Sequence, residues 1–114
     1  MPNALTAEKL KRYALDVLKV DALGVANIER FRGAPSEMDP RSIMPRARSV
    51  VVFIKRILRG TCRGIDEGTH YPSYSVFCYS QLNHMLGKAN YKLCRFIEDH
   101  GYEASPQSAS AALR

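Results

Sequence analysis

The chain has 114 residues, 46% of them hydrophobic, and carries a formal net charge of +6. This length is enough for one domain with a hydrophobic core. Glu8 and Lys9 interrupt the N-terminal segment before it reaches the apolar length of a signal peptide, and the longest apolar run, residues 50–54, is too short to span a bilayer. We therefore expect a cytoplasmic protein without a secretory leader or a membrane span.

The cysteines favour reduced thiols. Cys62, Cys78 and Cys94 are odd in number and widely spaced, which does not fit a disulfide framework. The closely spaced thiolates that hold an iron–sulfur cluster are absent, because no two cysteines form a CxxC pair. Cys78 shares a helix face with Met85, which favours a small apolar role, and we expect no metal site.

Positive charge is concentrated in one stretch, since residues 41–63 contain seven lysines and arginines and no acid. Clustered cations attract phosphate, on RNA or on a cofactor. The alternative is ordinary solvated arginine on both sides of a strand, and charge runs are most often of that kind. The candidate anion-binding residues are Arg46, Arg48, Arg56, Arg59 and Arg63.

The first half of the chain predicts a helix, a strand and a loop. Thr6 is a suitable N-cap for a helix over residues 7–19, whose apolar residues keep the helical period. Residues 23–26 predict a short buried strand in which Gly24 packs closely beneath that helix. Glycine and prolines predict a loop over 27–45, in which Asp39 and Pro40 cap one helical turn.

The second half predicts a strand, a loop and a long helix. Residues 49–58 contain an uninterrupted β-branched run, which predicts a central strand covered on both faces. Glycines predict an irregular, site-lining loop over 59–72. A sustained 3.6-residue period predicts a helix over 75–100 that Gly101 ends. Residues 102–104 then begin another strand, residues 1–104 form one domain fragment, and residues 105–114 form an irregular tail.

The predicted glycine-rich loop holds the strongest candidates for ligand contact. His70, Tyr71 and Tyr74 offer an imidazole and two phenols, which donate hydrogen bonds or protons to a bound ligand. The alternative is that the tyrosines pack at the edge of the core with wet hydroxyls and that His70 is an ordinary loop residue. We favour the alternative, and we assign no catalytic residue.

Four segments, taken in order, resemble one known family. They are RGAP at 32–35, MPRARSVVV at 44–52, RGIDEGTHY at 63–71 and RFIEDHGYEA at 95–104. These segments resemble the N-terminal region of epoxyqueuosine reductase-like proteins, which are relatives of the corrinoid iron–sulfur reductive dehalogenases. The resemblance covers most of the chain and implies a partial nitroreductase-like domain of the α/β (α+β) class, with a short mixed sheet packed by two main helices.

The resemblance also implies cofactors that this chain does not hold by itself. The full-length family binds cobalamin and two [4Fe–4S] clusters, and its tRNA-acting members reduce an epoxide on a modified base. A later glycine-rich segment and the cluster cysteines have no counterpart here. We therefore expect a truncated or split oxidoreductase of this family, inactive alone, which self-associates or binds a partner that completes the domain. The alternative is a non-enzymatic basic module that binds tRNA, another RNA or another polyanion.

Overall fold

A computed structural model describes residues 4–107 of the chain. The helix α1 (Ala7–Asp16) leads into strand β1 (Ala22–Asn27), and strand β2 (Ser49–Ile54) precedes helix α2 (Arg59–Glu67). The turn α3 (Pro72–Tyr74), the π-helical segment η4 (Ser75–Ser80) and helix α4 (Gln81–Asp99) then follow without a break. Three short 3₁₀ turns between the strands are η1 (Ile28–Phe31), η2 (Ser36–Met38) and η3 (Pro40–Ser42). The mixture of helix and strand confirms an α+β fold.

Helix α1 begins where the sequence predicts and ends earlier. The Thr6 hydroxyl accepts a hydrogen bond from the Lys9 amide at 3.1 Å, as an N-cap does. The helix ends at Asp16, before the predicted end at residue 19, because Lys19 takes a left-handed conformation with φ of 60°. This turn sends the chain back toward the sheet, so that Val20 enters the core.

The two strands form an antiparallel ladder from the Ala22–Ile54 pair to the Asn27–Ser49 pair. The predicted mixed sheet is therefore wrong for the described residues. The prediction of a strand covered on both faces is also wrong. Val52 and Ile54 point away from the helices and are 57% and 55% exposed. Gly24 lies on that outer face with no atom near the position of a Cβ, so the expected close packing beneath a helix does not occur.

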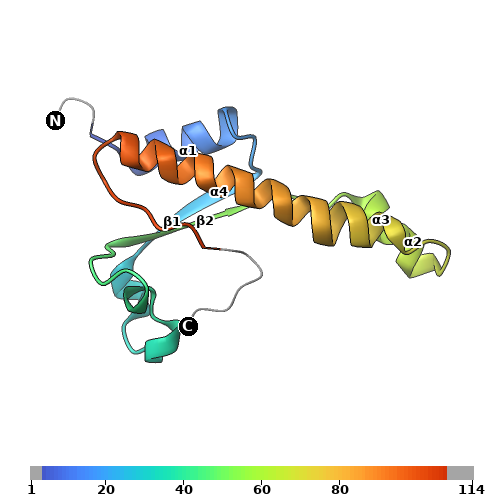
Figure 1. The fold of residues 1–114 in the computed structure, drawn as a ribbon, viewed down its shortest axis with the longest axis horizontal. Helices are drawn as coiled ribbons and strands as arrows, with labels where there is room; N and C mark the ends of the chain where they lie inside the picture. The colour runs from blue at the N-terminus through green and yellow to red at the C-terminus, as the bar shows by residue number, and fades with distance from the viewer. Residues whose placement is uncertain (1–3, 108–114) are drawn as a thin grey trace.

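The core lies between the other face of the sheet and two helices, α1 and α4 (Figure 1). The rings of Tyr13 and Phe96 stack at a centroid distance of 4.0 Å and join the two helices. This arrangement confirms the expected packing of two main helices on a short sheet. The buried residues of the cluster are Leu10, Ala14, Val20, Leu23, Ala89 and Leu93.

The predicted long helix is confirmed, with one irregularity. In η4 the amide of Gln81 donates to the carbonyl oxygen of Val76, a π-helical bond that places one extra residue in the turn. Cys78 is buried as expected, whereas Met85 is 44% exposed, so the predicted shared face of these two residues is not kept. Gly101 follows α4 with φ of 91°, as a C′ glycine does.

Two other predictions for this half of the chain are wrong. Residues 59–72 do not form an irregular loop, because α2 occupies most of them. Residues 102–107 have no regular structure, so no strand begins at 102. The predicted tail falls only partly within the described residues, since 108–114 lie outside them. Asp39 caps the predicted helical turn, its carboxylate accepting from the Arg41 amide at 3.0 Å.

The molecule is elongated. Its extents are 54 × 34 × 18 Å and its radius of gyration is 16.5 Å, whereas a compact chain of this length has a radius of about 13 Å. The N-terminal half of α4 runs beyond the sheet and carries α2 and α3 at its far end (Figure 1). Within residues 4–107, no helix has the length and apolar character needed to cross a membrane.

Candidate functional site

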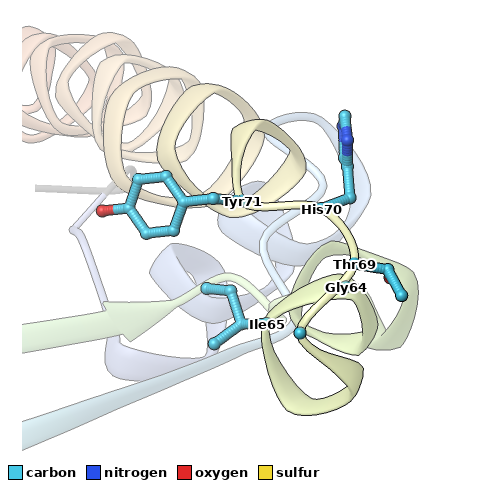
Figure 2. Close-up of a pocket in the computed structure, with 6 residues that line it drawn as sticks. Gly64, Ile65, Thr69, His70 and Tyr71 are labelled. Carbon is cyan, nitrogen blue, oxygen red and sulfur yellow. The ribbon is translucent and has the colours of Figure 1, made fainter.

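The segment between α2 and α3 folds back on itself and forms a shallow hollow (Figure 2). The amides of Thr69 and His70 both donate to the Gly64 carbonyl oxygen, at 2.8 and 3.1 Å. Gly68 ends α2 in a left-handed conformation with φ of 71°. A Cβ at Gly64 would lie against the His70 carbonyl oxygen and 2.8 Å from the His70 Cβ. Gly64 is therefore required for the close return of the chain.

The structure brings only two of the three loop candidates together. Tyr71 and Tyr74 have ring centroids 6.1 Å apart, inclined at 51°. The His70 imidazole points away from the Tyr71 ring (Figure 2). His70 and Tyr71 are both exposed. The three side chains thus do not converge on one ligand atom, and they form no pair of acid and base.

The basic stretch divides into two pairs at opposite ends of β2. Arg46 and Arg48 precede the strand, and Arg56 and Arg59 follow it. At about 3.3 Å per residue, the six strand residues separate the pairs by on the order of 20 Å. All four side chains are exposed, and none has an ion-pair partner among residues 4–107.

The other arginines of the stretch have acidic neighbours. Arg63 lies 3.8 Å from the Glu67 carboxylate, one turn along α2. Arg41 donates two hydrogen bonds from its guanidinium and one from its amide to the Asp39 carboxylate, and these bonds lower the pKa of that carboxyl. Arg63 is therefore the weakest of the five anion-binding candidates.

The three thiols lie apart on different segments. Cys62 is on α2, Cys78 on η4 and Cys94 on α4, and none forms a disulfide. Burial, and to a smaller extent the Glu98 carboxylate, raise the pKa of the Cys94 thiol. Among the described residues, no three histidine, cysteine or acidic side chains gather as metal ligands.

A second hollow lies on the exposed side of α4, and sequence reasoning missed it. His84, Lys88 and Lys92 recur every four residues, and Gly87 and Tyr91 have the same spacing. That spacing places them on neighbouring parts of one helix face, which is the signal that would have revealed them. The lining residues are Asn83, His84, Gly87, Lys88, Tyr91 and Lys92.

Comparisons of this chain with protein-family models, with curated proteins and with solved structures find no match. The resemblance described from the four segments therefore stays a prediction.

Replacing Gly64 tests the hollow between α2 and α3. We expect Gly64→Ala to lower the free energy of unfolding by about 1–3 kcal/mol, because the added methyl group overpacks the returning chain. Gly60→Ala is the matched control on the same helix. Its Cβ would meet no atom within 4 Å, so it should be neutral or stabilise by up to about 1 kcal/mol. Urea denaturation followed by circular dichroism measures both, and equal effects would contradict the packing.

The raised pKa of Cys94 predicts slow alkylation. Because the thiolate is the nucleophile, the rate at Cys94 should rise with pH around a midpoint above that of an exposed cysteine in a peptide. Glu98→Gln should lower the midpoint only in part, since burial is the larger cause. Site-resolved mass spectrometry after iodoacetamide pulses measures the rates, and a midpoint equal to that of the peptide would refute the assignment.

Proposed function

We propose that this chain is part of a larger cofactor-binding domain of the epoxyqueuosine reductase-like, corrinoid iron–sulfur oxidoreductase kind, and that it is inactive until further polypeptide completes it. The family assignment rests on the four sequence segments. The incompleteness rests on the structure, and one observation carries it: the outer face of the sheet is apolar and open to solvent.

Every residue on that outer face is apolar. β1 contributes small residues and β2 contributes β-branched ones, and the alternation of the ladder puts all six on the side away from α1 and α4. An antiparallel sheet with one solvated face normally alternates polar with apolar residues. The absence of polar residues therefore favours a covered face. The outer-face residues are Ala22, Gly24, Ala26, Val50, Val52 and Ile54.

The unpaired strand edges and exposed side chains elsewhere support the same conclusion. Each strand pairs on one side only among the described residues, which leaves backbone N–H and C=O groups along both edges of the ladder. Large side chains are also exposed beyond the sheet, in η4 and in the first half of α4. They include Phe77 and Tyr79 from η4 and Met85 from α4. Further strands beside the ladder and a layer over its outer face would bury these groups.

The candidate cofactor-binding side chains and the thiols lie apart in the described residues. His70 points away from Tyr71, so the imidazole and that phenol offer no common contact to a corrin ring (Figure 2). Cys78 and Cys94 are separated by sixteen positions of one long helix, about 24 Å along its axis, which is too far for one cluster. No step of the family's chemistry is therefore assigned to this chain.

Polar substitution of the outer face tests the proposal. We expect the wild-type chain to self-associate at high concentration, and the Val52→Lys/Ile54→Lys double variant to remain monomeric in multi-angle light scattering. Since both side chains are more than half exposed, thermal unfolding of the monomer should change little, by about 0.5 kcal/mol or less per residue.

Phe53→Lys is the matched control, because Phe53 lies between the same two residues but faces the core. It should unfold the chain. A monomeric wild-type chain at millimolar concentration would contradict the need for a covering partner. A saturable change in the visible spectrum of cobalamin added to the chain alone would contradict the proposal that further polypeptide is needed to complete the cofactor site.

A second candidate function is polyanion binding, and the unpaired arginines at the two ends of β2 favour it. We expect tRNA binding to weaken steeply with added salt, because phosphate contacts release counterions. The measured quantity is the slope of the logarithm of the binding constant against the logarithm of the salt concentration, here called the salt slope. It should become shallower in two double variants, Arg46→Gln/Arg48→Gln and Arg56→Gln/Arg59→Gln, by about 1 for each arginine that binds a phosphate in the wild type. Fluorescence anisotropy across a salt series measures the slopes. Unchanged slopes in both variants would exclude this candidate.

A further inference from the structure

The outward face of α4 carries a stripe of basic residues around one tyrosine. At about 100° per residue, Lys88, Tyr91 and Arg95 fall on one side of the helix, roughly opposite the buried residues Ala89 and Leu93. His84 and Lys92 border them, and the side chains of all five stripe residues are exposed, Tyr91 by 63%. The sheet and α1 pack against the other side of α4, so this stripe remains open (Figure 1).

Gly87 makes room beside the tyrosine. Gly87 lies one turn before Tyr91 on the same helix face, and both residues line the hollow on this face. A Cβ at Gly87 would meet no atom within 4 Å, and the hollow on this face lies at that position. Glycine within a helix is less favourable than alanine. Here it leaves a position in the hollow, one turn before the exposed tyrosine, without a side chain.

The charge around the ring has one sign. Residues 68–97 contain no aspartate or glutamate, and the first acids of this face, Glu98 and Asp99, come at the C-terminal end of α4. Lys88, Lys92 and Arg95 have no ion-pair partner among residues 4–107. A negatively charged ligand therefore meets three cations without displacing a carboxylate.

We propose that this stripe binds single-stranded nucleic acid, with a base stacked on the Tyr91 ring in the hollow at Gly87 and the neighbouring phosphates on Lys88 and Lys92. Proteins commonly hold unpaired bases with an aromatic ring beside cations. The base stacks on the ring, and the cations bind the neighbouring phosphates of the backbone. A base inside a duplex does not offer its face, so single strands fit and duplexes do not. The surface differs from the arginine pairs at β2, and the proposal does not rest on the cofactor-domain assignment.

Replacing the tyrosine is the main test, with the full chain and fluorescein-labelled oligouridine or oligothymidine in low salt. Fluorescence anisotropy should show that Tyr91→Ala weakens binding by about 5- to 150-fold, the effect of losing one stacked base. Tyr91→Phe should retain the affinity, because it keeps the ring. Tyr102→Ala removes another exposed tyrosine, 53% exposed and outside α4, and should bind like the wild type.

Filling the hollow separates stacking from helix stability. Gly87→Leu should raise the thermal midpoint of the monomer, because leucine favours helix, and should weaken binding by covering the ring. Lys88→Gln and Lys92→Gln should each lower the salt slope by about 0.7, the value for a contact to a single strand.

Several results would overturn the proposal. They are equal losses in Tyr91→Ala and Tyr102→Ala, equal affinity for a duplex of the same length, or no binding of any oligonucleotide in low salt. Loss of binding in Arg46→Gln/Arg48→Gln together with full binding by Tyr91→Ala would also overturn it, and would place nucleic acid on the arginines at β2 instead.

Discussion

The packing of α1 and α4 against one face of the two-stranded ladder holds this chain together. The sheet contributes Leu23, Val51 and Phe53 to the shared core, and the helices contribute Leu10, Ala14, Ala89 and Leu93. The stacked rings of Tyr13 and Phe96 join the two helices directly. Such a ladder is too small to be stable without this contact. The α2–α3 end lies outside this cluster and depends on α4 for its position.

A core on one side of the sheet explains why the other surfaces are unusual. On the outer face of the sheet, no other element among the described residues covers the small residues of β1 and the branched residues of β2. This face also carries no charged side chain that would favour exposure to water. Charges gather elsewhere, at the ends of β2 and along the outer side of α4. The molecule thus offers an apolar surface suited to polypeptide and a separate basic surface suited to phosphate.

Strong local patterns made much of the fold predictable. The cap at Thr6, the β-branched run of β2 and the long period of α4 each appear in the structure. Helix α2 was missed because Gly60 and Gly64 lower helix propensity and Leu58 provides no side-chain cap, although Gly68 is a helix-stop signal. The open outer face and the divergence of His70 from Tyr71 were not predictable, because each depends on neighbours that a local pattern does not name.

The π-helical turn of η4 determines the direction in which the α2–α3 end faces. A π-helical turn contains one more residue than an α-helical turn. This extra residue rotates the preceding segments, α2 and α3, by about 100° around the axis of α4. The aromatic residues Tyr71 and Tyr74 and the hollow at Gly64 are therefore oriented independently of the core, by the length of η4. A homologous chain one residue shorter there would keep the same packed half and present this end to a different side of any assembly.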